Sequence, residues 1–285
     1  MAFSLNFKNS PLPNPPPDFD AQYIRQMIRV LEIYFDQLDA WNLQVYNALT
    51  TPGGGAAIKF PFGSFYQNGN TALTGNITNV STTPIPVTST TEFESSGFII
   101  IGNEIIQYTG KTATTFTGIT RGVKSTTNVA HNTGAAVTEA AGVAAGSSAA
   151  ANLDSVVISN GITCTVPDSK VYFDYDGVYN IQFSTQLLNY TNAEDNVTVW
   201  FKKNNVDIPE SASIEQVNAK HGSNPGATIM ALNFVDSFNA GDYFELYWAS
   251  NSGNTVLATY PPGTSPTHPA SPSLILTVTF VSAIP

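Results

Sequence analysis

The chain has 285 residues, only 11% of them charged, and a formal net charge of -10 at pH 7. Ordinary soluble domains contain about 25% charged residues, so uncharged polar residues, Gly and Pro take their place here and favour β structure with many turns. The acidic balance argues against a nucleic-acid-binding protein, which needs a basic surface, and against attachment to an anionic membrane. The length allows two small domains, or one sandwich with an extension.

Residues 1–18 are expected to form an extended anchoring arm. They contain prolines that favour the polyproline conformation and leave no room for a helix before Asp18, namely Pro11, Pro13, Pro15, Pro16 and Pro17. We expect this arm to be disordered or to lie along a neighbouring chain. Residues 1–7 lack the apolar core and cleavage site of a signal peptide, and no run of apolar residues is long enough for a membrane span, so neither is expected.

Residues 19–50 are expected to form an amphipathic, trimerising helix. With Ile24 at heptad position a, positions a and d are apolar over four heptads, and the charged residues all fall at b and f. Asp20 is expected to cap the helix, with Phe19 and Ile24 forming a hydrophobic staple, and residues 50–55 are expected to end it. The predicted trimer interface consists of Ile24, Met27, Leu31, Tyr34, Leu38, Trp41 and Val45.

The apolar stripe of this helix is wider than a two-stranded coiled coil needs. Ile28 and Phe35 at position e and Val30 at position g flank the seam, where a dimer normally places charges. This width favours three or more helices, or a helix trimer that other chains also cover. The alternative is an ordinary amphipathic helix that packs on its own domain.

Residues 51–139 are expected to hold a connection followed by a small β module. Residues 98–101 and 104–108 read as two strands joined by a two-residue turn at Gly102, and residues 115–119 read as a third strand. A module of this size is expected to pack on its copies or its neighbours. Residues 140–153 are rich in Ala, Gly and Ser and have few large side chains, so they are expected to be a linker.

Residues 154–285 are expected to form an antiparallel sandwich of at least seven strands. The final strand, residues 274–281, is apolar on both faces and should lie centrally in its sheet. Cys164, in a predicted strand over residues 156–166, is expected to be a small buried hydrophobe. Residues 247–285 contain no Asp, Glu, Lys or Arg. We interpret this as burial partly by other subunits; the alternative is that Ser, Thr, Asn and Pro solvate the surface.

The C-terminal half resembles the trimeric jelly roll of tumour necrosis factor and of the globular heads of complement-type collagenous proteins. The matching features are the turn-and-strand segments at residues 176–181 and 239–246 and the apolar final strand. This resemblance implies a tight three-fold trimer whose outer loops bind partners. The heptad helix stands where that family has a collagenous stalk.

Two further segments resemble phage proteins. Residues 13–23 and 35–38 resemble virion structural proteins of marine, cyanophage-like tailed phages. Residues 104–111, with 120–123 and 130–131, resemble a small β module that recurs in phage tail and decoration proteins. Together these resemblances imply a homotrimeric tail-fibre or capsid-decoration subunit on the virion surface. Its N-terminal arm and helix would contact other virion proteins, and its jelly-roll head would point outward.

The sequence offers no catalytic motif, so no enzyme activity and no cofactor or metal are expected. Asp174 with Asp176, and Glu92 with Glu94, could supply paired carboxylates for glycan hydrolysis, but both pairs precede turns and are interpreted as solvated turn carboxylates. Asp174 and Asp176 could also bind Ca²⁺, although no EF-hand-like ligand series accompanies them.

A long Pro-stiffened loop near the C-terminus is a candidate recognition loop. Its predicted site residues are Tyr260, Pro261, Pro262 and His268. The leading hypothesis is therefore a structural virion protein. A compatible second hypothesis is a host-attachment module that recognises a surface glycan or protein. A depolymerase acting on surface polysaccharide is the least favoured.

Overall fold

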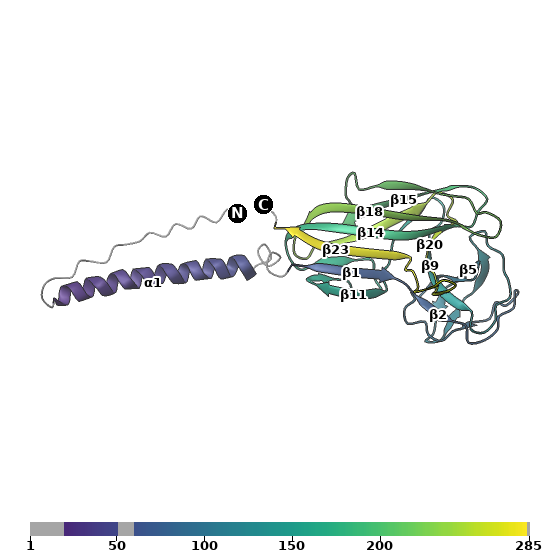
Figure 1. Ribbon diagram of the computed structural model, residues 1–285, viewed down its shortest axis with the longest axis horizontal. Helices are drawn as coiled ribbons and strands as arrows, with labels where there is room; N and C mark the ends of the chain where they lie inside the picture. The colour runs from purple at the N-terminus through teal and green to yellow at the C-terminus, as the bar shows by residue number, and fades with distance from the viewer. Residues whose placement is uncertain (1–19, 51–59, 284–285) are drawn as a thin grey trace.

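The computed structural model describes residues 20–50 and 60–283. Within them the chain forms one helix, α1 (Ala21–Thr50), and a mainly β body from which the helix stands apart (Figure 1). Asp20 caps the helix as predicted, because its Oδ1 accepts a hydrogen bond from the Gln22 backbone N–H at 2.8 Å. The anchoring arm, Phe19 of the staple and the predicted stop at residues 51–55 lie outside the described residues.

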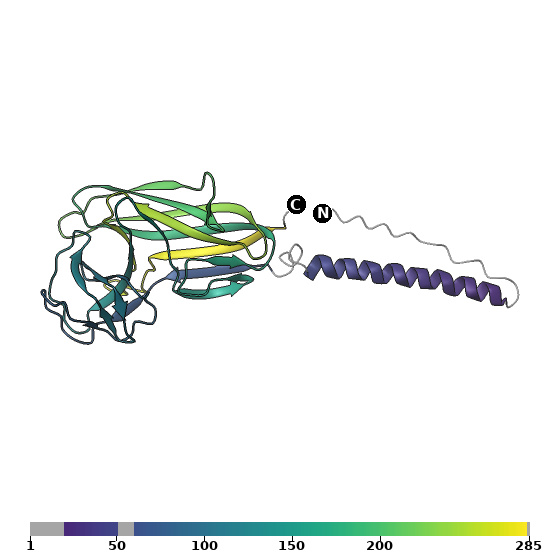
Figure 2. The ribbon, with the colours of Figure 1, turned by 180° about the vertical axis from the view of Figure 1, so that it is seen from behind.

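Two large antiparallel sheets form the β body (Figures 1 and 2). The first follows the order β11-β1-β23-β14-β20-β9-β4-β5-β8, with β18 beside β14 and β2 beside β9. Its strands, in chain order, are β1 (Phe62–Gln67), β2 (Asn70–Ala72), β4 (Gly97–Ile101), β5 (Glu104–Tyr108), β8 (Thr120–Val123), β9 (Ala136–Gly142), β11 (Ser155–Asn160), β14 (Gly177–Asn189), β18 (Gly226–Phe238), β20 (Thr255–Ala258) and β23 (Leu274–Ser282).

The second sheet follows the order β12-β13-β19-β15-β16, with β10 beside β19 and β17 beside β15. Its strands are β10 (Ser148–Ala150), β12 (Ile162–Thr163), β13 (Val171–Phe173), β15 (Asp195–Lys203), β16 (Val206–Asp207), β17 (Ser213–Val217) and β19 (Tyr243–Ser250). Two small sheets complete the fold. One contains β3 (Ile85–Pro86), β6 (Gly110–Lys111) and β7 (Thr115–Thr117), and the other contains β21 (Gly263–Thr264) and β22 (Thr267–His268).

The two large sheets pack face to face over one core. Phe65, Tyr179 and Phe183 enter it from the first sheet, and Phe201 and Trp248 enter it from the second. Each buried aromatic side chain contributes roughly 1.5–3 kcal/mol of transfer free energy. Long strands support this core because their side chains alternate between core and surface, as β14 does over most of its length. The predicted mainly β fold with antiparallel sheets is confirmed.

The predicted hairpin of the β module is confirmed. Strands β4 and β5 pair with Ile100 opposite Ile105, and Gly102 takes the positive φ of 60° that the turn requires. The module has its own core, in which the rings of Phe93 and Phe116 meet edge to face at 5.0 Å.

Residues 140–153 contain strands and buried side chains, which corrects the expectation of a linker. They hold the end of β9 and all of β10, and Ala140, Ala151 and Leu153 are buried. Strand β9 pairs with β20, and β10 pairs with β19. The first sheet therefore crosses the predicted boundary between the module and the head.

The C-terminal strand occupies the position predicted for it. Strand β23 pairs with β1 on one side and β14 on the other. Cys164 is buried, as predicted. The strand expected over residues 156–166 is instead two strands, β11 and β12, in different sheets. Gly161, with a φ of 66°, turns the chain from one sheet to the other.

Candidate recognition pocket and association surfaces

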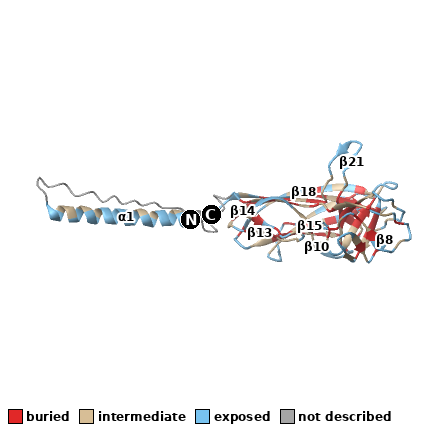
Figure 3. Ribbon diagram, turned by 90° about the horizontal axis from the view of Figure 1, so that it is seen from below, coloured by how far each residue is buried: buried red, intermediate tan, exposed pale blue. Residues whose placement is uncertain are grey.

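The predicted recognition loop divides into a pocket wall and a projecting hairpin. Backbone hydrogen bonds of 2.9 and 3.0 Å join Tyr260 to Ser271 at the base of the loop. Beyond this base, β21 and β22 form a small hairpin that stands out from the body (Figure 3). Exposed His268 belongs to this hairpin, where its Nδ1–H donates to the Pro269 carbonyl at 2.8 Å. Pro262 is also exposed, so Tyr260 and Pro261 are the predicted residues that reach the pocket.

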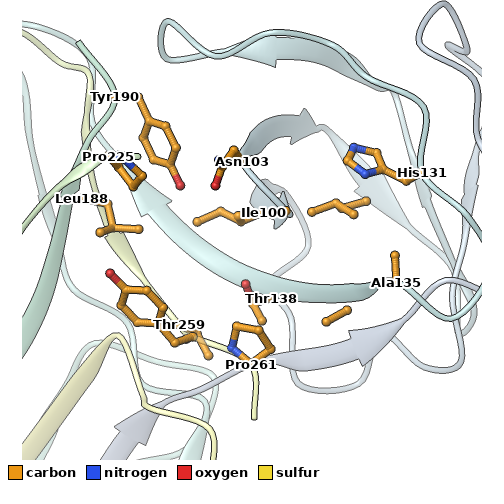
Figure 4. A pocket seen from close by; sticks show the side chains of 14 residues that line it. Ile100, Asn103, His131, Ala135, Thr138, Leu188, Tyr190, Pro225, Thr259 and Pro261 are labelled. Carbon is orange, nitrogen blue, oxygen red and sulfur yellow. The ribbon is translucent and has the colours of Figure 1, made fainter. Parts of the chain in front are cut away.

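The pocket has a volume of about 460 Å³ and lies where the module meets the head (Figure 4). This volume falls within the range of roughly 300–1,000 Å³ that is typical of small-molecule sites. The module supplies Ile100, Ile101, Gly102, Asn103, His131, Ala135, Ala136 and Thr138, and the head supplies Leu188, Tyr190, Pro225, Thr259, Tyr260 and Pro261.

Several contacts fix the pocket walls. The Asn103 side-chain amide donates to the Ser223 carbonyl at 3.0 Å and so joins the β4–β5 turn to the head. Thr259 donates its backbone N–H to the backbone carbonyl of Glu139 in β9 at 3.1 Å. The Thr259 hydroxyl donates to the Gln67 carbonyl at 3.3 Å. Behind these walls lies an apolar cluster that includes Ile100, Leu188 and Tyr190. The cavity therefore has fixed walls from both parts of the body.

A buried ion network supports the module side of the pocket. Glu104, with a side chain 0% exposed, accepts hydrogen bonds from Arg121 Nε at 2.6 Å and Arg121 Nη2 at 2.7 Å. His131 Nε2 lies 2.8 Å from the same carboxylate, which also accepts from the backbone N–H groups of Gly122 and Val129. Burial alone would raise the pKa of Glu104, but these hydrogen bonds and the Arg121 charge lower it.

This network brings together three residues from separate segments of the module. Glu104, Arg121 and His131 are distant in sequence, yet one carboxylate holds the other two side chains. Their role in the structure is to fix the β5 and β8 strands and residues 129–131 to one another. His131 was not a predicted site residue, but its ring lines the pocket.

Sequence reasoning missed most of the pocket because its walls meet only in the fold. Asn103 and Tyr190 are far apart in the chain, and no spacing rule links the hairpin turn to the end of β14. The glycine turn was recognisable, but its partner surface was not. Tyr190 carried no local signal, since an aromatic residue near a strand end is a common core residue.

A buried pair of carboxyl groups, Glu139 and Asp154, lies near the module–head junction. Asp154 Oδ2 accepts hydrogen bonds from the backbone N–H groups of Asn68 and Gly69 at 2.8 and 2.9 Å. The other oxygen of Asp154 and Oε2 of Glu139 are buried and receive no N–H or hydroxyl donor in the described chain. Burial, the hydrogen bond to Asp154 and the charges of Asp154 and Glu94 raise the pKa of Glu139 well above its usual value. The raised pKa favours the protonated form of Glu139, which is the form that can donate a hydrogen bond to Asp154.

The predicted interface residues of α1 are only partly covered. Ile24, Met27, Leu38, Trp41 and Val45 are half-buried, whereas Leu31 and Tyr34 are exposed. The flanking residues Ile28 and Phe35 are 47% and 58% exposed. No strand packs on the described part of this helix (Figures 1 and 2). A single copy thus leaves the apolar stripe largely in contact with solvent.

The outer face of the first sheet carries no charged side chain across five neighbouring strands. This face belongs to β18, β14, β23, β1 and β11, and it is defined by the side chains that alternate with the buried core residues. They are Ala227, Ile229, Ala231, Asn233, Val235, Ser237, Val178, Asn180, Gln182, Ser184, Gln186, Ile275, Thr277, Thr279, Phe62, Ser64, Tyr66, Ser155, Ile158 and Asn160. We call it the uncharged face. It contains a shallow hollow of about 410 Å³ around Ser184, Ala231 and Ile275.

The two edge strands of the uncharged face, β18 and β11, expose apolar side chains. On β18, which pairs only with β14 among the described strands, Ile229 and Val235 are 62% and 54% exposed. On β11, at the other edge, Val157 and Ile158 are 54% and 56% exposed. Long edge strands with exposed apolar residues are sites where another chain can pair or pack. The uncharged face is therefore bordered on both sides by exposed apolar residues.

The two acidic pairs considered for catalysis, Asp174 with Asp176 and Glu92 with Glu94, have different surroundings in the fold. Asp176 Oδ1 accepts a hydrogen bond from the Ala240 backbone N–H at 2.7 Å and so joins two turns. Glu94 accepts one from the Asn152 side chain, and burial is the main cause that raises its pKa. In residues 20–50 and 60–283, no three His, Cys, Asp or Glu side chains are arranged to hold a metal ion.

Comparison with known proteins leaves the chain without an assigned family. No protein-family model matches it, and no curated protein matches it. Within the described residues, no helix is long and apolar enough to cross a membrane.

Proposed function

We propose that this chain is a non-enzymatic structural subunit of a tailed-phage virion that assembles as a homotrimer. In this proposal the helix and the uncharged face bind other copies, and the N-terminal segment contacts further virion proteins. The virion assignment rests on the sequence resemblances of residues 13–23 and of the β module. The uncharged face is the structural observation that carries the self-association part of the proposal.

The contrast between the two outer faces of the sandwich supports self-association. The outer side of the second sheet carries cations over aromatic rings, with Lys202 Nζ 4.3 Å from the Tyr247 ring centroid and Lys170 Nζ 4.8 Å from that of Tyr243. Asp207 there accepts a hydrogen bond from Trp200 at 2.8 Å. Depletion of charge is typical of the buried centre of an interface. The outer face of the first sheet therefore has the composition of a contact surface, and the outer face of the second has that of a solvent-exposed surface.

The sheet orders and the helix support an assembly of three subunits. The orders β11-β1-β23-β14-β18 and β12-β13-β19-β15-β16 agree with a jelly roll of the kind that the C-terminal half resembles. In α1, the exposed flanking residues Ile28 and Phe35 widen the stripe beyond what two helices cover. A second copy is the occupant that fits both surfaces, because each is uncharged and apolar in part.

A charge placed in the hollow of the uncharged face is expected to prevent assembly. Ala231 is exposed in the single chain, so Ala231→Arg should fold normally. In a trimer it would bury an unpaired charge in each copy, at a cost of about 3–5 kcal/mol per site. Sedimentation velocity should show monomers for this variant. The matched control Ala193→Arg, on an exposed loop, should sediment like the unchanged protein; equal masses for the two variants would contradict the proposed interface.

The virion role has its own test. Purified particles of the phage that encodes the chain should contain it, as detected by mass spectrometry of the particle proteins. Gold-labelled antibody against the β body should then mark the particle surface in electron micrographs. Absence of the chain from purified particles would contradict the virion role and leave the self-association result unaffected.

Host attachment is a second candidate function, and the position of the pocket favours it. Strand β1 starts at the end of the body nearest the helix and leads towards the module at the far end (Figure 1). The pocket is lined in part by residues of this module. The β21–β22 hairpin projects from the body near the pocket wall formed by Tyr260 (Figure 3). An anchored subunit would present this end outward. Loss of adhesion to host cells on deletion of residues 263–268 would support this role, and unchanged adhesion would contradict a role of the hairpin in attachment.

A further inference from the structure

The charge of the pocket wall restricts the class of ligand. None of the residues that line the pocket is Asp, Glu, Lys or Arg, and Nε2 of the lining residue His131 is already paired with the Glu104 carboxylate. A charged ligand would lose its hydration there without gaining an ion pair, which costs free energy. A purely hydrocarbon ligand is also disfavoured, because buried polar groups of the wall would be left without partners. The wall therefore suits an uncharged molecule that has both hydroxyl groups and apolar C–H surfaces.

Four polar groups of the wall have hydrogen-bonding capacity left over. The hydroxyls of Tyr190, Tyr260 and Thr138 hydrogen-bond to no other described residue, and the Asn103 carbonyl oxygen is open because only its amide group is used. In Figure 4 the Tyr190 hydroxyl points towards Asn103, and Thr138 lies across the cavity from both. Burial raises the pKa of Tyr190, and the nearby Tyr260 contributes to the same shift. Burial also raises the pKa of Tyr260, so both phenols stay neutral donors across the physiological range.

Apolar side chains lie between these polar groups. Ile100, Leu188 and Pro261 line the same cavity and present aliphatic surface without a hydrogen-bonding group in the side chain. A pyranose ring needs this combination, since its hydroxyls point outward around the ring and its C–H groups form apolar patches. Aliphatic contacts exclude water from those patches, while the placed polar groups fix the orientation of the ring.

We propose that this pocket binds a neutral monosaccharide unit, such as the terminal hexose or 6-deoxyhexose of an uncharged glycan, through Asn103, Thr138, Tyr190 and Tyr260. The walls are preorganised, because Asn103 is fixed to Ser223 and Thr259 to Glu139. A preorganised site loses little conformational entropy on binding. This inference deepens the attachment role and rests on it for its biological purpose. The self-association role can hold or fail without it.

The test is saturation-transfer NMR on the full-length protein with methyl glycosides as probes. The probes are the neutral methyl glycosides of glucose, galactose, mannose, fucose and rhamnose, with the anionic methyl glycoside of sialic acid as the charged comparator. At least one neutral glycoside is expected to receive saturation and to bind with a millimolar Kd, and the sialoside is expected to receive none. If no neutral glycoside receives saturation, or if the sialoside binds equally well, the proposal is wrong.

One pair of variants assigns the binding to the pocket. Tyr190→Phe removes a single hydroxyl from the wall and should weaken binding of the responding glycoside about tenfold. Tyr172→Phe, in β13 and packed against Tyr243 with centroids 5.4 Å apart, is the matched control and should leave the Kd unchanged. An unchanged Kd for a folded Tyr190→Phe protein would overturn the assignment. Glycoside binding without adhesion to host cells would contradict the attachment role alone.

Discussion

Replacing Arg121 with Met is expected to lower the free energy of unfolding by about 3–5 kcal/mol, because it leaves the Glu104 carboxylate buried without its main partner. Both side chains are almost fully buried, with Arg121 4% and Glu104 0% exposed. The Arg121 guanidinium donates twice to this carboxylate and also to the carbonyls of Thr78 and Val129. The substitution therefore removes the connection between three separate segments of the module.

Urea unfolding followed by tyrosine and tryptophan fluorescence measures this loss. The control is Lys202→Met, which removes a surface ion pair whose Nζ–Oδ1 distance to Asp207 is 3.5 Å. Exposed pairs contribute about 0–1 kcal/mol, so this variant should change little. If Arg121→Met costs no more than the control, the buried network is not what holds the module together.

The Glu104 network also has a defined pH dependence. Because the folded-state pKa of Glu104 lies below its ordinary value of 4.5, the network stabilises the fold above the pKa of the unfolded state. That stabilisation is lost as the pH falls through the lowered folded-state pKa. We therefore expect the stability of the module to fall in acid as Glu104 becomes protonated.

Replacing Glu139 with Gln is expected to stabilise the protein at neutral and alkaline pH. Glu139 is 3% exposed, and its folded-state pKa is raised well above 4.5, so the native state retains a proton that the unfolded chain has released. Stability from the Glu139–Asp154 pair is therefore complete below the unfolded pKa and falls as the pH rises towards the folded pKa. The slope is about 1.4 kcal/mol per pH unit in that window.

The carboxamide side chain introduced by this substitution would donate an N–H to Asp154 at every pH. Glu139→Gln should therefore flatten the dependence of thermal stability on pH between about pH 5 and pH 8, whereas Glu210→Gln, at an exposed turn, should leave the slope unchanged. Differential scanning calorimetry across that range gives both slopes. An unaltered slope in Glu139→Gln would show that the pair does not share a proton.

Local signals in the sequence predicted the elements that depend on local chemistry. Asp20 begins the helix because its side chain accepts from the Gln22 N–H, and a carboxylate at that position needs no tertiary partner. Gly102 marks the hairpin turn because its positive φ is accessible to glycine at little cost. Apolar residues on both faces of β23 indicated a central strand, and both edges of this strand are paired within one sheet.

Elements that depend on distant neighbours could not be predicted in the same way. The Ala-rich segment around Ala140 looked like a linker because small side chains rarely form a core by themselves. In the fold they are buried because β4 and β20 come close on either side of β9. The pocket was hidden for a similar reason. Its Tyr190 and Asn103 acquire a common function only when the head packs against the module.

The mass of the full-length protein in solution tests the central claim, self-association through the helix and the uncharged face, most directly. Light scattering coupled to size-exclusion chromatography at micromolar concentration gives this mass without any assumption about shape. The proposed assembly predicts a single species of three times the 30.4 kDa chain mass. A stable species with the mass of one chain would contradict the account.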